Sequence, residues 1–309
     1  MPSRRDFLKV AGTSLVLGGL YCVQRTAYAD EATKETALEI CQLTNATPSQ
    51  MMAYILRTKN GQIIVVDGGM PGDRDALLAQ LKEMGLAEGQ KIAAWLLTHA
   101  HLDHFGAIAT LINENRLPAV EKIYFSFPPQ EWLDTYEAYC KDQTALFYDA
   151  IKKVPQEQIV TTKAGMKLTI DNVTITVLND FDLNLHGNAI NNSTVVYRLD
   201  VPNCLSMLFL GDLGKERGQA LLDTLPPELL KADAVQMAHH GQQGVAKSFY
   251  AAVAPKECYW PTPNWLWDNN PGSGYNTGPW KTLETREWVK ELGIETHHVA
   301  KDGTQRKTY

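Results

Sequence analysis

The most informative residues of this 309-residue chain form the run His99-Ala100-His101-Leu102-Asp103-His104. Imidazole and carboxylate groups are the usual ligands of catalytic Zn²⁺, and a catalytic site keeps one position open for water. His99 and His101 are two residues apart, so on an extended segment their side chains point the same way. Asp103 and His104 then begin the next turn and can face a second metal. The run therefore predicts half of a two-metal site rather than a set of surface histidines.

Three other short motifs follow runs that are typical of buried strands. Asp67-Gly68-Gly69 follows a β-branched run, Gly211-Asp212 follows an apolar one, and His239-His240-Gly241 follows a short strand pattern. Each motif therefore lies at a strand-to-loop junction, as the histidine run does. Between the motifs, the pattern predicts helices after Asp73, over 105–115, 130–154, 244–254 and 281–292, and hairpins over 166–178 and 193–210. Two mixed sheets packed face to face, with helices outside, satisfy this order.

The four motifs resemble those of the metallo-β-lactamase superfamily in type, order and spacing, over about residues 41–309. The resemblance implies an α/β (α+β) fold, a four-layer αββα sandwich. It also implies a role for each motif residue. His99 and His101 would bind the first metal, and Asp103, His104 and a later His would bind the second. Asp212 would bridge the two metals, and Asp67 would give structural support to the metal loop.

The region before Asp212 departs from a pattern that many members share, a further His in a Gly-His-Thr-type motif. Here the chain has His186, a candidate metal ligand whose alternative is a loop histidine near the pocket, and then Asn191-Asn192-Ser193. That run, together with His-His-Gly, resembles the branch that contains competence-protein hydrolase domains and phosphorylcholine esterases. Members of this branch often have another His in a later Asn-x-Tyr-x-His-Pro run. This chain has Asn276–Pro279 there, without a His, so the role of that His is not assigned to this chain.

Two regions should determine the reaction and the choice of substrate: the His239-His240 pair and residues 259–280. Neighbouring residues on an extended segment point opposite ways, so we predict His240 as the metal ligand. His239 is then catalytic together with Asp103, either contacting substrate phosphate or serving as an acid. A dense aromatic stretch over 259–280 is a substrate wall or, alternatively, a folded surface loop. Aromatic faces can hold a quaternary ammonium or stack a base. The candidate substrate-binding residues are Trp265, Trp267 and Tyr275 in addition to His239.

Residues 1–29 have the pattern of a twin-arginine signal peptide. Arg4-Arg5 precedes an apolar stretch from Val10 to about Val23, and Ala27-Tyr28-Ala29 offers small residues where a signal peptidase cleaves. The alternative is an N-terminal membrane anchor, but the apolar stretch is short for a membrane span. We therefore predict use of the twin-arginine export machinery, a periplasmic or extracellular location at the cell envelope, and no stable membrane anchor after cleavage.

Composition fits one globular domain over 41–309, after a leader at 30–40. Hydrophobic residues make up 44% of the chain, charged residues 21%, and the net charge is -6. A negative chain binds long nucleic acids poorly, because phosphate contacts dominate their affinity. Small anionic substrates remain possible beside a bound metal. Cys41, Cys140, Cys204 and Cys258 form no Cys-x-x-Cys pair, which leaves disulfides and buried thiols both open.

The favoured function is a two-metal hydrolase that uses a metal-bridging hydroxide to cleave a phosphodiester or related phosphoester. Its substrate would be a small molecule or a cell-envelope component. One alternative is hydrolysis of a lactam, lactone or thioester, since the fold does not fix the substrate. The other is a non-catalytic metal-binding envelope protein, against which the retention of Asp67, Asp103 and Asp212 argues. Two divalent ions are expected, Zn²⁺ by default, although Mn²⁺ or Fe²⁺ also suits a His/Asp set.

Overall fold

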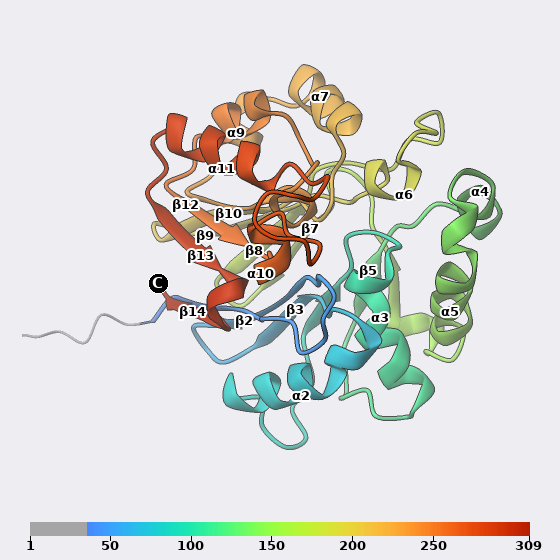
Figure 1. Ribbon diagram of the computed structural model, residues 1–309. Helices are drawn as coiled ribbons and strands as arrows, with labels where there is room; N and C mark the ends of the chain where they lie inside the picture. The colour runs from blue at the N-terminus through green and yellow to red at the C-terminus, as the bar shows by residue number, and fades with distance from the viewer. Residues whose placement is uncertain (1–35) are drawn as a thin grey trace, which may run out of the picture. The chain divides into compact units, whose positions relative to one another are not determined.

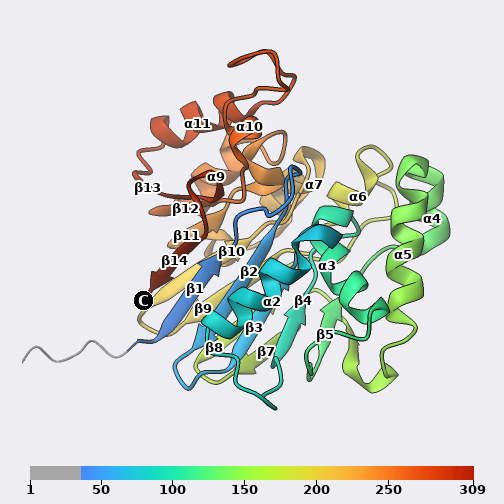
Figure 2. The same cartoon turned by 60° about the horizontal axis from the view of Figure 1, so that its bottom comes forward.

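Two sheets form the centre of the protein. The computed structural model describes residues 36–309, and within that range the strands make two sheets of seven (Figures 1 and 2). The first sheet runs in the order β14 (Gln305–Thr308), β1 (Leu38–Gln42), β2 (Ala53–Thr58), β3 (Ile63–Asp67), β4 (Ala94–Leu96), β5 (Ile123–Phe125), β6 (Ile159–Thr161). The second runs β13 (Thr296–Val299), β12 (Glu257–Trp260), β11 (Ala234–Gln236), β10 (Leu205–Phe209), β9 (Tyr197–Val201), β8 (Val173–Val177), β7 (Lys167–Ile170).

Both sheets are mixed in the same way. In the first, β14, β1, β2 and β3 pair antiparallel, and β3 to β6 pair parallel. In the second, β7 to β10 pair antiparallel and β10 to β13 pair parallel. The central strands β3, β4 and β11 are buried at every residue, which explains why β3 is a continuous β-branched run. Its Ile63 and Val65 face the outer helices, while Ile64 and Val66 face the other sheet.

Helices cover the outer face of each sheet. Over the first sheet lie α2 (Arg74–Glu83), α3 (Leu102–Asn113) and α5 (Lys141–Ile151), with α4 (Gln130–Tyr136) beside them. Over the second lie α7 (Lys215–Thr224), α9 (Lys247–Val253) and α11 (Thr282–Glu291), which Figure 1 shows above the sheets. The short helices α6 (Ala189–Asn192), α8 (Pro227–Leu230) and α10 (Asn264–Trp267) lie in the connections. The predicted αββα sandwich is confirmed.

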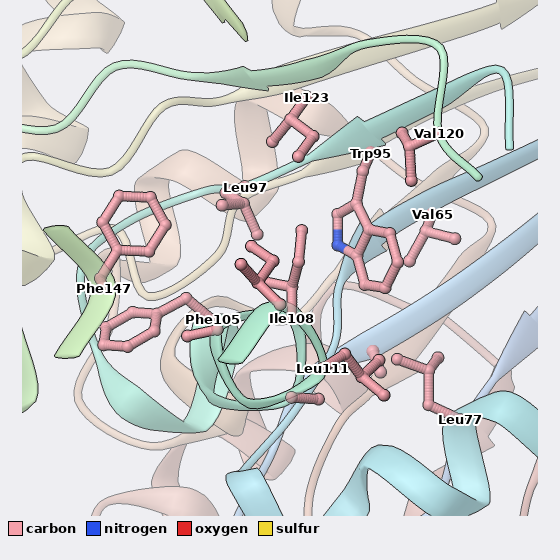
Figure 3. Packing of buried hydrophobic residues seen from close by; sticks show 14 of the residues in the cluster. Val65, Leu77, Trp95, Leu97, Phe105, Ile108, Leu111, Val120, Ile123 and Phe147 are labelled. Atoms are coloured by element: carbon pink, nitrogen blue, oxygen red, sulfur yellow. The ribbon is translucent and has the colours of Figure 1, made fainter. Parts of the chain in front are cut away.

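The outer core of the first sheet fixes the position of α3, the helix that begins inside the histidine run. Figure 3 shows Trp95 of β4 packed beside Leu111 and Ile108 of α3, with Phe105 against Phe147 of α5. Gly106 lies where α3 crosses the Asp67-Gly68-Gly69 turn, and a Cβ there would overlap the ring of Pro71. Close packing of α3 onto this turn therefore holds the metal-loop residues beside Asp67.

Three features of the chain differ from expectation or resolve an open alternative. The predicted leader at 30–40 overlaps β1, because Leu38 already pairs with Thr58. The helix predicted over 130–154 is broken at Glu137, between α4 and α5. The cysteines of the described range are all free thiols, Cys41, Cys140, Cys204 and Cys258. Among the described helices, none is both long and apolar enough to cross a membrane. The predicted signal peptide lies outside the described residues.

Candidate metal centre

Loops that follow strands of both sheets bring the predicted ligands together. The histidine run follows β4 of the first sheet, while Asp212 follows β10 and His240 follows β11 of the second. His99, His101 and Asp212 form one group of ligand atoms that all lie within 4.8 Å of one another. Asp103, His104, Asp212 and His240 form a second group by the same measure. Asp212 belongs to both, as a bridging ligand would.

Two of the imidazoles are oriented by Thr98 and Asp67. The Nδ1 of His104 lies 2.7 Å from Oδ2 of Asp67, and the Nδ1 of His99 lies 3.0 Å from Oγ1 of Thr98. Asp67 also accepts hydrogen bonds from the backbone N–H and hydroxyl of Thr98, at 2.8 and 2.7 Å. Since one nitrogen of each ring is held in this way, the Nε2 of His99 and of His104 is free to bind a metal. Asp67 therefore occupies its predicted supporting position.

The other two imidazoles have outer partners as well. The Nδ1 of His240 donates to the carbonyl oxygen of Pro261 at 2.8 Å, which leaves Nε2 facing Asp103 at 3.1 Å. The Nε2 of His101 lies 3.8 Å from Oε2 of Glu137, while its Nδ1 faces His99. Each ligand histidine thus presents one nitrogen to the centre and the other to a second partner, the usual arrangement around a bound metal.

The unpartnered atoms of the centre fit divalent metal ions. Asp212 is almost fully buried, yet neither of its carboxylate oxygens has a hydrogen-bond partner in the described chain. The Nε2 of His104 lies 3.1 Å from Oδ1 of Asp212 as an ion pair. Buried polar atoms without partners are costly unless something else binds them. Two His-rich groups that share one carboxylate are the donor set expected for a pair of such ions.

His239 and His240 are both close to Asp212, which differs from the geometry that we predicted. The segment is not extended, because both residues have left-handed backbones with φ of 51° and 53°. Adjacent side chains therefore do not point to opposite sides. The Nε2 of His240 lies 3.5 Å from Asp212 and that of His239 lies 3.8 Å away. Of the two, His240 belongs to the second ligand group, while His239 stays partly exposed.

The structure places several other candidates away from the ligand groups. His186 belongs to neither group, because its loop directs the exposed ring toward α4, where it stacks on Tyr136 at 4.0 Å. Trp267 packs against the buried Trp260 and under the guanidinium of Arg286, in the outer core of the second sheet. These contacts support packing roles for His186 and Trp267 instead of the predicted ligand and substrate roles.

The remaining aromatic candidates differ in their position. Trp265 donates from its indole nitrogen to the carbonyl of Pro48, on the loop that also carries Gln50, and packs edge-on against Trp280. Tyr275 is 64% exposed in the same 264–281 segment. His297 and His298 make packing contacts on β13, where His297 accepts from Trp260 and His298 pairs with a glutamate. Trp265 is thus the aromatic candidate nearest to the ligand loops by its contacts.

Sequence reasoning missed three polar residues of the centre. Gln50 donates to Oδ2 of Asp103 at 3.0 Å and accepts from Gln242 at 3.0 Å. Glu137, only 4% exposed, lies behind His101 and also accepts from the backbone of Ile190 at 3.0 Å. Each lies in a loop or helix break without a motif.

Replacing Glu137 with Gln should weaken metal binding at the group that contains His101. Gln lacks the charge that holds the imidazole, and outer partners of this kind contribute about 10–100-fold to metal affinity. The measurement is competition with a chromogenic chelator. Glu257→Gln is the matched control, because Glu257 is also a partly buried carboxylate, 3.0 Å from the ring of His298, but lies outside the ligand groups. Equal affinities for the two variants would contradict a positioning role of Glu137.

Metal uptake should release protons at neutral pH. Burial lowers the pKa of His101, but Cys140, Glu137 and the nearby aspartates outweigh it and raise the pKa to about 10. Burial likewise opposes the charge on His240, yet Asp212 and Asp103 raise its pKa to about 9. Both rings are therefore protonated without metal and must lose a proton to bind one. Between pH 8 and pH 6, the affinity for metal should fall about tenfold per pH unit for each proton released. Calorimetry in buffers of different ionisation enthalpy measures the number of protons released. Proton-independent binding would contradict these pKa values.

Comparison with known proteins supports the fold. Residues 46–176 match the model of the metallo-beta-lactamase superfamily. The chain has the metallo-β-lactamase fold. It is 14% identical to the metallo-beta-lactamase fold protein YhfI from Bacillus subtilis, covering 87% of this chain and 99% of that one, with a TM-score of 0.52. It is 12% identical to CmlA, a diiron beta-hydroxylase from Streptomyces venezuelae, covering 89% of this chain and 54% of that one, with a TM-score of 0.51.

These similarities establish the fold and leave the substrate open. This chain spans about half the length of CmlA. No curated protein matches the sequence. Metallo-β-lactamase superfamily proteins are mostly metal-dependent hydrolases, and CmlA shows that the fold also carries a hydroxylase. The two ligand groups around Asp212, on this fold, are consistent with a dinuclear metal site.

Proposed function

We propose that this protein is an exported hydrolase that cleaves a phosphodiester or a related phosphoester. The observation that carries the proposal is the pair of ligand groups joined by Asp212, with His239 beside them. Two metals held in this way supply a water of lowered pKa and stabilise both the attacking and the leaving oxygen of an in-line displacement. The Asn191–Ser193 and His-His-Gly motifs give independent support from the sequence.

His239 is suited to contact the substrate. Its Nε2 lies 3.8 Å from Asp212, and its Nδ1 has no hydrogen-bond partner in the described chain. Burial lowers the pKa of His239, so its ring is neutral at neutral pH and keeps one N–H to donate. A phosphate oxygen bound beside Asp212 can accept that hydrogen bond. Of its two predicted roles, substrate contact therefore fits His239 better than proton donation.

Alanine substitutions should separate the two histidines. His240→Ala removes a nitrogen from the second ligand group, so the variant should retain about one equivalent of metal. His239→Ala should retain two and lose turnover by about 100-fold, the lower range for loss of one hydrogen-bond donor to developing charge. Metal content by mass spectrometry, paired with turnover of bis(p-nitrophenyl) phosphate, tests both expectations. Loss of metal from His239→Ala would reverse the assignment.

A substrate panel tests the proposed reaction itself. Protein loaded separately with Zn²⁺, Mn²⁺ or Fe²⁺ is assayed on bis(p-nitrophenyl) phosphate, a chromogenic lactam, a lactone and a thioester. We expect the phosphodiester to give the highest kcat/KM. A higher value on the lactam, lactone or thioester would replace the proposal with the other hydrolase class. Metal-replete protein without turnover on any of them would favour a non-catalytic envelope role.

Export by the twin-arginine machinery is part of the proposal and rests on the sequence of residues 1–29. Changing Arg4 and Arg5 together to Lys keeps the charge and removes the twin-arginine pair. The variant should accumulate uncleaved inside the cell, as fractionation would show. Unchanged export of this variant would exclude the twin-arginine route and leave the hydrolase proposal intact.

A further inference from the structure

A cavity of about 420 Å³ lies where the first turns of α7, α9 and α11 approach one another. Figure 1 shows these three helices together on the outer side of the second sheet. Its polar lining includes Lys215, Lys247, Lys281, Gln242 and Glu284, and Trp288 forms part of its apolar lining. The volume is within the range of small-molecule sites, roughly 300–1,000 Å³.

The lining of this cavity is positively charged, although the chain as a whole carries a net charge of -6. Three lysines and a single acidic residue, Glu284, line the cavity. Lys281 lies 3.9 Å from Glu284, and Lys247 pairs with Glu291 at the end of α11. Lys215 has no ion-pair partner in the described chain. The amino ends of the ten-residue helices α7 and α11 add partial positive charge at the same place.

The cavity is linked to the metal centre through the chain and through hydrogen bonds of Gln242. Lys215 begins α7, three residues after the bridging Asp212. Gln242, two residues after His240, lines the cavity and donates from Nε2 to Gln50, which in turn donates to Asp103. The loop that carries the second metal's histidine thus also forms part of the cavity lining.

We propose that this cavity is a phosphate subsite for the part of the substrate that is not cleaved. The proposal rests on the phosphoester function and narrows it to diesters that carry a terminal phosphate. The diester group would lie at the ligand groups around Asp212, and the terminal phosphate would reach Lys215 and Lys281 past Gln242. Lysines bind phosphate as point charges.

Lys215→Ala tests the subsite through substrate preference. The variant is compared with wild type on bis(p-nitrophenyl) phosphate and on a p-nitrophenyl diester that bears a terminal phosphate. The kcat/KM ratio of the phosphate-bearing ester to the plain one should fall about tenfold, the effect of one charge-assisted hydrogen bond. Lys290→Ala, an exposed lysine on α11 outside the cavity, should keep the wild-type ratio. A wild-type ratio in Lys215→Ala would overturn the proposal.

Binding of inorganic phosphate tests the same subsite without turnover. Calorimetry on metal-loaded protein should show one fewer phosphate bound, or about tenfold weaker binding, in Lys215→Ala/Lys281→Ala than in wild type. Equal stoichiometry and affinity would overturn the subsite. If neither diester is hydrolysed by wild type, the phosphoester function fails, and the calorimetry still decides whether the cavity binds phosphate.

Discussion

Asp212→Asn should lose at least one of two bound metals and reduce turnover of bis(p-nitrophenyl) phosphate by roughly 10³-fold or more. The carboxylate is the one ligand common to both groups. Its Oδ1 lies 3.1 Å from Nε2 of His104, and its Oδ2 lies 3.7 Å from Nε2 of His99. A carboxamide has the same shape but no charge, and only its oxygen binds a metal. Loss of charge stabilisation worth several kcal/mol corresponds to this reduction in rate.

The pKa of Asp212 supports the same expectation. Burial opposes its ionisation, but His104, His240 and His239 outweigh burial and hold the pKa well below its ordinary value. The carboxylate is therefore charged throughout the pH range of an assay, and the substitution removes a full charge. Asp223→Asn, an exposed carboxylate on α7, is the control. Two tightly bound metals in Asp212→Asn would show that Asp212 does not bridge them.

The sandwich and most of the ligand set could be predicted because their signals are local. Buried parallel strands appear as β-branched runs, and metal ligands cluster where such runs end. The histidine run, Asp212 and His239-His240-Gly241 are motifs of this kind, and the structure brings their possible ligand atoms together. Glu137 and Gln50 could not be found in this way. They reach His101 and Asp103 from loops whose positions depend on packing, and a single Glu or Gln carries no pattern.

The errors have a common physical origin in backbone direction. We treated His239 and His240 as extended, whereas both have positive φ, a conformation that non-glycine residues seldom adopt. His186 was a candidate because many family members have a ligand His in this region, yet its loop turns to α4. Trp267 was grouped with its aromatic neighbours, although α10 directs it toward Arg286 and the outer core. Residue type indicated what these side chains could do, but tertiary structure decided where they lie.

Asp67→Asn should empty the second metal position and lower the free energy of unfolding of the metal-free protein by about 3 kcal/mol, the cost of leaving buried donors unpaired. The Asp67 carboxylate accepts three hydrogen bonds, two from Thr98 and one from His104. An amide offers one oxygen, and its NH₂ would face the Nδ1–H of His104. The ring would relieve that clash by moving its proton to Nε2, and Nε2 could then no longer bind a metal.

The backbone makes this substitution a specific test. Asp67 has φ of 57°, and asparagine tolerates that left-handed conformation, so Asp67→Asn changes the hydrogen bonds and adds little strain. Asp171→Asn is the matched control, because Asp171 also has a left-handed backbone, at φ 54°, in an exposed hairpin turn outside the ligand groups. Metal content and urea unfolding are measured for both variants. If Asp67→Asn binds two metals and unfolds like the control, then Asp67 does not set the proton position on His104, and the orientation of the second group must come from His240 and Asp103 alone.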